Sequence, residues 1–323
     1  MAIYSVIDLI NSIKKRDVAR VRRMLKEGVD IEGAPKGGGG LRPLHYAAMA
    51  SNMEILDLLV DHKADVMALD DFGRLPIHHA ARCGQTSAIL SLLSCGNPVN
   101  AQDGLKCTPL HYALEAGANE AARMLIQRGA DIRARDMNGV TPMHHAAGTG
   151  NGGIARILFD RGAEPDARNV HGRSPLMEAV THAHARVVAL LLDRGADPAA
   201  VDEEGNQPLH FARNPAEIDM LVAKGADINA RNSDGNTPLH VAAMHDIHQM
   251  LMHFLKIGAD PAVKNKGGAM PHGLANVGFN RDILRKAAGE WPAKQEAECA
   301  AWLAGLRRRL AALGALRPKN PAL

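Results

Sequence analysis

Histidine is the residue type in this chain with the most obvious capacity for chemistry. The 323 residues include 16 histidines, and imidazoles bind transition metals and transfer protons near neutral pH. His245, His248 and His253 lie within one short segment, and two histidines three residues apart on a helix can share a metal ion. No cysteine or carboxylate completes a recognisable ligand set there, so the sequence predicts no metal site and no cofactor.

Six other histidines recur at one position of a short motif, which favours a structural role for them. They are His45, His78, His111, His144, His210 and His240. No H-E-x-x-H, G-x-S-x-G or phosphate-loop signature occurs in the chain, and the recurring acidic residues fall in predicted turns or on solvated helix faces. We therefore expect a protein that is not an enzyme and has no small-molecule substrate.

The histidine motif belongs to an internal repeat. Prolines stand 33 residues apart five times in succession, and two more follow after 30 and 33 residues: Pro43, Pro76, Pro109, Pro142, Pro175, Pro208, Pro238 and Pro271. Most lie in a variant of one tetrapeptide, which is cleanest as Thr108-Pro109-Leu110-His111. A fixed period of this length indicates a supersecondary unit that buries its apolar face against its neighbours.

One period, residues 136–168, predicts two helices and a turn. Thr141 can cap the first helix with its hydroxyl, and Pro142 suits the first helical position. Apolar residues then recur at helical spacing up to Gly162, which tolerates the conformation that ends a helix. The segment from residue 164 to 172 is rich in Asp, Asn and Gly, and it reads as an extended turn to the next unit.

The spacing, the T-P-L-H-x-A motif and the recurring Gly-Ala-Asp resemble the ankyrin repeat over residues 1 to about 290. The resemblance implies an all-α repeat solenoid, an ankyrin-like stack of antiparallel helix pairs with projecting β-hairpin loops. It also implies that the motif histidine binds backbone groups between units. Hairpin tips and first helices would line a concave surface that binds another protein.

The repeat phase predicts the organisation of the chain. A degenerate N-terminal capping repeat is expected at 1–36, and a degenerate C-terminal repeat at 265–290. Seven repeats lie between them, at 37–69, 70–102, 103–135, 136–168, 169–201, 202–231 and 232–264. Residues 291–323 are expected to form a C-terminal amphipathic helix and a basic tail. This helix either caps the last repeat or binds a partner or a membrane surface.

Two repeats depart from the template. The four glycines at 37–40 lack the Lys-Ser or Lys-Thr of a phosphate loop, so we expect a flexible first hairpin. The repeat at 202–231 lacks three residues between its helices. There Asn214-Pro215-Ala216-Glu217 reads as a new helix start, so the array is expected to continue through this repeat with a local change of curvature.

Composition narrows the class of partner and the compartment. Proteins bind nucleic acid with basic patches and stacking aromatic rings. A net charge of only +3 and an aromatic content of 3% therefore disfavour a nucleic-acid partner. Four cysteines without paired spacing suit a reducing compartment, and we find no signal peptide and no run of 18 apolar residues. We expect a monomeric, cytoplasmic protein; the alternative is delivery into a host cell by a non-classical secretion system.

The predicted hairpin tips are the candidate site for binding a partner protein. They carry apolar side chains flanked by arginines, a composition found at interface hot spots. The candidates are Phe72, Arg74, Arg82, Leu105, Arg135, Met137, Val140, Arg168, Val170 and Arg173, with Val201 as a further apolar tip. In the alternative interpretation the tips pack on one another, and each arginine pairs with Asp103, Asp136 or Asp202.

The predicted function is that of a non-catalytic scaffold or adaptor that binds a partner protein through this surface. Three alternatives remain open at this point: a host-directed effector that uses the same surface, a basic surface that binds nucleic acid, and membrane binding through the C-terminal helix.

Overall fold

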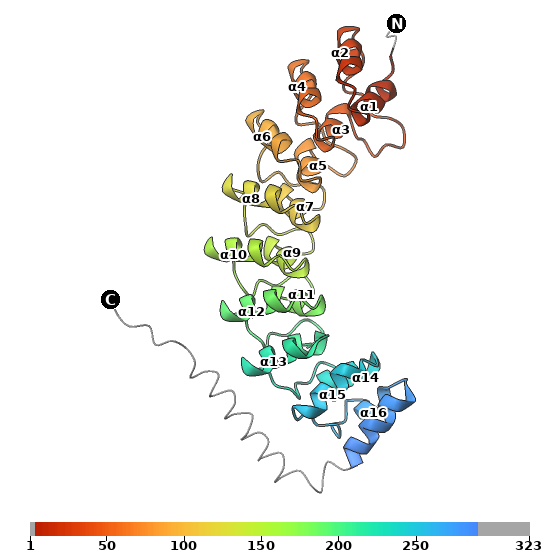
Figure 1. The fold of residues 1–323 in the computed structure, drawn as a ribbon, viewed down its shortest axis with the longest axis vertical. Coiled ribbons are helices and arrows are strands. Elements are labelled where there is room, and N and C mark those ends of the chain that lie inside the picture. Colours follow the sequence, from red (N-terminus) through yellow and green to blue (C-terminus); the bar gives the residue numbers. More distant parts are fainter. Residues whose placement is uncertain (1–3, 290–323) are drawn as a thin grey trace, which may run out of the picture. The chain divides into compact units, whose positions relative to one another are not determined.

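The computed structural model describes residues 4–289, and these residues are helical with connecting loops (Figure 1). They divide into two compact units, and the division falls between Val170 and His171 in the sequence. The predicted C-terminal helix at 291–323 lies outside the described residues. None of the described helices is long and apolar enough to cross a membrane.

Unit 1 consists of five helix pairs. Their bounds are α1 (Val6–Lys14) and α2 (Val18–Lys26), α3 (Pro43–Met49) and α4 (Met53–Asp61), α5 (Pro76–Arg82) and α6 (Thr86–Ser94), α7 (Pro109–Glu115) and α8 (Asn119–Gln127), α9 (Pro142–Gly148) and α10 (Gly152–Asp160). From α3 onward the first helix of each pair begins at the motif proline and has 7 residues, whereas the second has 9. The sequence placed these helix starts correctly.

Unit 2 continues the same pattern with one interruption. Its helices are α11 (Pro175–Thr181), α12 (Ala185–Asp193), the 3-10 helix η1 (Pro208–Phe211), α13 (Pro215–Ala223), α14 (Pro238–Met244), α15 (His248–Lys256) and α16 (Pro271–Leu274), and residues 278–289 are also helical. The missing residues at 202–231 shorten the first helix to the four residues of η1. Asn214 caps α13 through a bond from the Glu217 amide, as predicted.

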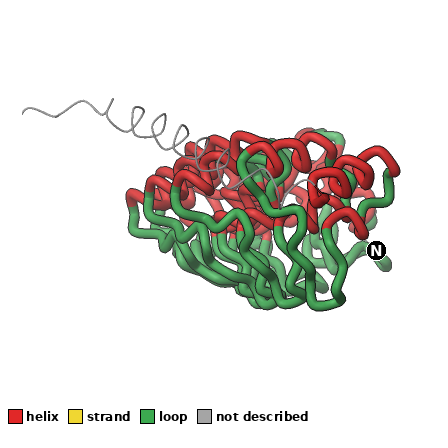
Figure 2. The backbone as a smooth tube through the Cα atoms, turned by 90° about the horizontal axis from the view of Figure 1, so that it is seen from below, coloured by secondary structure: helices red, strands yellow, loops and turns green. Residues whose placement is uncertain are grey.

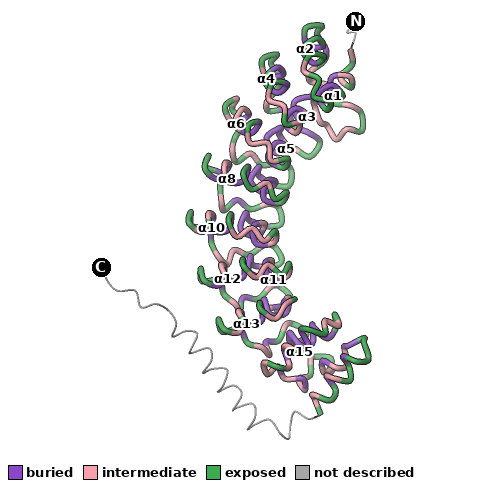
Figure 3. The backbone as a smooth tube through the Cα atoms, viewed as in Figure 1, coloured by how far each residue is buried: buried purple, intermediate pink, exposed green. Residues whose placement is uncertain are grey.

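Aliphatic side chains on the helices form the core of each unit. Leu44, Ile77, Leu110, Leu176 and Leu239 each follow a motif proline and are at most 1% exposed. Buried alanines three residues further on let the first helices approach closely, and these helices pack on one another more extensively than the second helices do. The far ends of the second helices are exposed (Figure 3).

The loops between pairs project to one side of the helices in each unit (Figure 2). Two backbone hydrogen bonds close each of the loops at 70–74, 103–107 and 136–140; in the last of these, the Asp136 amide donates to the Val140 carbonyl at 3.1 Å. No segment of residues 4–289 is a β-strand. The expected β-hairpins are therefore tight turns, because so few bonds per loop do not make a strand ladder.

Candidate functional site

An aspartate at the first position shapes the turn in three loops of unit 1, at 70–74, 103–107 and 136–140. Oδ1 of Asp70 accepts hydrogen bonds from the amides of Phe72 and Arg74, both at 2.9 Å. Asp103 and Asp136 make the equivalent pairs of bonds two and four residues ahead. The carboxylate thus holds the loop backbone on the side that faces the helices, and the side chains of the following residues are directed outward.

Successive loops of unit 1 are joined to one another through their backbones. The Gly104 amide donates to the Phe72 carbonyl at 2.9 Å, the Met137 amide to the Leu105 carbonyl at 2.8 Å, and the Val170 amide to the Asn138 carbonyl at 2.8 Å. The two loops lie so close together at Gly73, where φ is +75°, that a Cβ atom on this residue would lie 3.0 Å from the Gly104 amide nitrogen. Only glycine fits there without strain.

The glycine-rich segment at 37–40 forms the first loop of this series. Its Gly39 carbonyl accepts a hydrogen bond from the Asp71 amide at 3.0 Å. It therefore contacts the loop that carries Phe72 instead of forming an isolated phosphate-binding loop.

Four large apolar side chains stand on the joined loops and define what we call the loop row. Exposure is 59% for Phe72, 53% for Leu105, 55% for Met137 and 47% for Val170. They occupy two neighbouring loop positions: Phe72 and Leu105 are third in their loops, and Met137 and Val170 are second. Because each side chain remains about half exposed, the loop row is not buried by packing of the tips on one another.

Val140 differs from the loop row. Its side chain is half-buried, its amide donates to Asp136, and its carbonyl accepts from Nε2 of His111 at 3.2 Å. Val140 therefore lies at the base of its loop, and its expected place at a hairpin tip is wrong. Val201 is 45% exposed but belongs to unit 2.

Neighbouring groups hold Arg74, Arg135 and Arg173 in place. Arg74 binds Asp70, with Nε 2.7 Å from Oδ2, and its guanidinium lies 4.7 Å from the centre of the Phe72 ring. Arg135 donates to the Arg168 carbonyl. In unit 2, Arg173 binds Glu178 at 2.8 Å. Arg82 and Arg168 are exposed.

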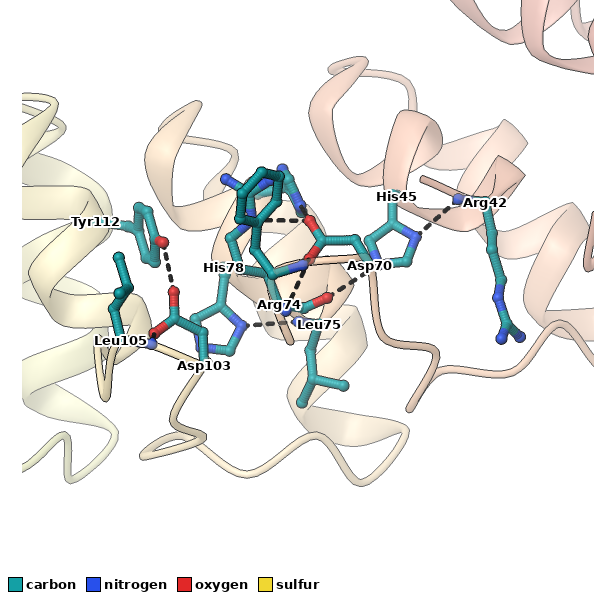
Figure 4. A network of polar contacts seen from close by, with 11 residues as sticks. Arg42, His45, Asp70, Arg74, Leu75, His78, Asp103, Leu105 and Tyr112 are labelled. Carbon is teal, nitrogen blue, oxygen red and sulfur yellow. Dashed lines mark hydrogen bonds and ion pairs between the residues drawn. The ribbon is translucent and has the colours of Figure 1, made fainter. Parts of the chain in front are cut away.

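The alternative pairing of these arginines with Asp103 is wrong. Oδ2 of Asp103 accepts from the Tyr112 hydroxyl at 2.5 Å, beneath the Leu105 loop (Figure 4). The corresponding contact one repeat earlier joins Asp70 to Nε2 of His79 at 2.9 Å. Tyr112 and His79 each directly follow a motif histidine, nine residues after the loop aspartate. This nine-residue spacing is the sequence signal that would have revealed both contacts.

Burial dominates the ionisation of these groups. It lowers the pKa of His79 to about 4, so that the imidazole is neutral at pH 7 and donates its Nε2 proton to Asp70. Burial alone would raise the pKa of Asp70, but hydrogen bonds from Arg74, His79 and Phe72 bring it below its usual value. A carboxylate therefore supports the loop at neutral pH.

The motif histidines bind backbone between loops, as the resemblance implies. Nδ1 of His45 accepts from the Arg42 amide at 3.1 Å, and Nε2 bonds to the Arg74 carbonyl at 3.1 Å (Figure 4). His111 and His240 also accept from the hydroxyl of the preceding threonine. Both ring nitrogens are occupied by these bonds, which is a structural role.

The segment with three histidines does not form a cluster in the structure. Nδ1 of His248 lies 2.8 Å from Oδ1 of Asn280, and Nε2 of His253 lies 2.8 Å from Oδ1 of Asp219. Within residues 4–289, no group of three or more His, Cys, Asp or Glu side chains could hold a metal ion.

Comparison with known proteins identifies the class. A family model of ankyrin repeats in three copies matches residues 9–103, 77–169, 131–202 and 176–265. These ranges extend over most of the chain, and the chain belongs to the ankyrin-repeat family. The prolines, the histidine motif and the helix pairs described above account for that match.

A curated relative shares a short stretch of sequence. The chain is similar to the 2-5A-dependent ribonuclease of Mus musculus, with 40% identity over 57 residues. The match spans 18% of this chain and 8% of the ribonuclease. Ankyrin repeats are in general protein-interaction scaffolds, and so short a match brings no evidence of catalysis to this chain.

Proposed function

We propose that the chain is a non-catalytic adaptor that binds a partner protein through the loop row of unit 1. The observation that carries the proposal is the row itself. Phe72, Leu105 and Met137 are each more than half exposed on loops that hydrogen bonds hold in fixed order. Large apolar side chains contribute little to folding while they remain in water, but they contribute strongly when a partner covers them.

The fixed backbone of the loops favours this function. The loops are joined to one another and supported by Asp70, Asp103 and Asp136, so binding requires little ordering of the chain. Less conformational entropy is then lost on association, and more of the contact energy appears as affinity.

The charges near the loop row favour protein over nucleic acid. Arg74 is paired with Asp70, and its guanidinium stacks on Phe72, the one aromatic side chain of the row. Phosphate binding needs unpaired basic groups, and single-stranded bases need several stacking rings. A partner held by apolar contacts would stay bound as salt is raised, whereas phosphate-driven binding would weaken steeply.

We place the interaction in the cytoplasm. Cys83, Cys95 and Cys107 are free thiols, which suits a reducing compartment.

The test separates folding from binding. Phe72→Ser and Met137→Ser are expected to keep the melting temperature near that of the wild type and to lose the partner recovered by affinity purification. Ile7→Ser is the matched control, because Ile7 is 54% exposed on α1, outside the loop row. If both loop variants melt early, the tips stabilise the fold. If both remain folded and keep the partner, the loop row is not the interface.

A further inference from the structure

Unit 2 contains a hollow of about 270 Å³ at the repeat whose first helix is shortened. It lies between η1 and α14 and is bordered by the loops that precede them, with Glu204 on one loop and Asp234 on the other. The neighbouring first helices α11 and α14 have 7 residues, whereas η1 has 4. Space that a further helical turn would occupy is therefore open.

One side of the hollow is acidic. Glu204 and Asp234 are exposed, and their loops are joined by a hydrogen bond of 2.9 Å from the Ser233 amide to the Glu204 carbonyl. Glu204 accepts one hydrogen bond, from Asn206, while no described residue bonds to the Asp234 carboxylate. Both carboxylates retain capacity to accept from a ligand.

Part of the lining is apolar. Phe211, Val241 and Ile247 are half-buried, and Met244 is 37% exposed. Arg173 lies over the Phe211 ring at 4.4 Å and is itself bound to Glu178.

A buried amide faces the same space. Asn206 and Asn236 line the hollow and are each 7% exposed. Oδ1 of Asn236 accepts from Asn265 at 2.8 Å, but no described residue accepts a hydrogen bond from its Nδ2. An NH₂ group of this kind is available to a carbonyl oxygen that enters the hollow.

We propose that this hollow binds one lysine or arginine side chain of a peptide. The aliphatic stem would lie on Phe211 and Val241, the cationic head would bind Glu204 and Asp234, and a peptide carbonyl would accept from Nδ2 of Asn236. The volume is below the ~300–1,000 Å³ of sites that enclose a whole small molecule, and it suits a single side chain.

The basic part of the lining limits what the peptide can carry. Arg213 and His245 also line the hollow, and no described residue bonds to either side chain. A second basic residue of the peptide would meet the charge of Arg213, so the hollow selects a single basic residue and not a polybasic tract. The proposal does not depend on the loop row, which lies in unit 1.

The first experiment uses the full ¹⁵N-labelled chain and small probes. Nα-acetyl-lysine N-methylamide and its arginine counterpart are expected to shift the amide signals of Asn206, Asn236 and Gly235 progressively. Nα-acetyl-norleucine N-methylamide keeps the stem without the charge, and it is expected to bind at least about tenfold more weakly. Equal shifts by the norleucine probe, or no shift at these residues with any probe, would overturn the proposal.

The second experiment removes the negative charge. Glu204→Gln combined with Asp234→Asn is expected to weaken binding of the lysine probe by about tenfold or more. Glu203→Gln is the control, because Glu203 is exposed beside Glu204 but does not line the hollow. Phe72→Ser should leave probe binding unchanged, which separates this proposal from the loop row. If the double variant keeps a native amide spectrum and binds the probe as the wild type does, the assignment is wrong.

Discussion

Nε2 of His79 lies 2.9 Å from Oδ2 of Asp70, and this contact ties the helix α5 to the loop that carries Phe72. The same carboxylate also binds Arg74 and two backbone amides. Asp70 is therefore the residue on which the position of Phe72 depends most directly.

Replacing Asp70 by Ala is expected to lower the free energy of unfolding by about 2–4 kcal/mol, because four donors lose a charged acceptor. Asp71→Ala is the control; Asp71 is the exposed neighbour, and its removal should change stability by less than about 0.5 kcal/mol. Urea unfolding of both variants provides the measurement. Equal losses would show that Asp70 does not support the loop.

Acid should destabilise the chain through its buried histidines. Burial lowers the pKa of His45, His78 and His111 below the usual 6.5, and that of His145 to about 4. The unfolded chain then binds more protons than the folded chain between about pH 6.5 and 4. The contribution of these histidines to stability is complete above pH 6.5 and falls progressively as pH drops through that window.

His145→Gln isolates one of these groups, and it should reduce the loss of stability between pH 7 and 4.5 by about 1–3 kcal/mol. Urea midpoints at several pH values give the comparison. An unchanged pH slope would mean that His145 protonates freely in the folded state.

The sequence was sufficient for the helix pairs because each start is marked locally. Most helix pairs have a proline at the first helical position, a leucine directly after it and a glycine near the end. The phase of the repeat could therefore be read without tertiary information. The contacts of Asp70 and Asp103 were missed because they join a loop to a helix nine residues later. The hollow was not predicted, because the sequence shows that three residues are absent at 202–231 but not whether the neighbouring helices fill the space that they leave.

Two substitutions compare the motif threonine with the core leucine. Oγ1 of Thr141 lies 2.8 Å from Nδ1 of His144, so the hydroxyl bonds to the imidazole in place of the expected backbone amide. Thr141→Ala should cost about 1 kcal/mol. Leu176 is 0% exposed, and Leu176→Ala should cost about 2–5 kcal/mol. A larger loss for the threonine variant in urea unfolding would contradict this order.

Local unfolding should be easiest at 202–231. Each helix pair contacts mainly its neighbours, and here the first helix is a short 3-10 helix with a buried, unpaired Oε1 at Gln207. Hydrogen exchange in native buffer should therefore show the lowest protection of the interval from 70 to 264 in this repeat. Uniform protection across that interval would contradict the expectation.

Glu217 in the same repeat should make stability depend on pH in the direction opposite to the histidines. Its side chain is 0% exposed, and neither carboxylate oxygen has a hydrogen-bond partner among the described residues. Burial raises its pKa from 4.5 to about 7, and nearby Asn214 and the Arg213 backbone offset only part of this effect.

The folded chain therefore binds more protons at this residue than the unfolded chain between about pH 4.5 and 7. The contribution of Glu217 to stability is present below pH 4.5 and is lost as pH rises through that window. Glu217→Gln keeps the shape without the charge, so it should stabilise unit 2 at pH 8 by about 1–3 kcal/mol relative to the wild type and have little effect at pH 4.5. Glu203→Gln, on an exposed side chain, is the control. Hydrogen exchange of residues 202–231 at both pH values measures the difference, and equal protection in wild type and Glu217→Gln at pH 8 would show that the carboxylate reaches water when ionised.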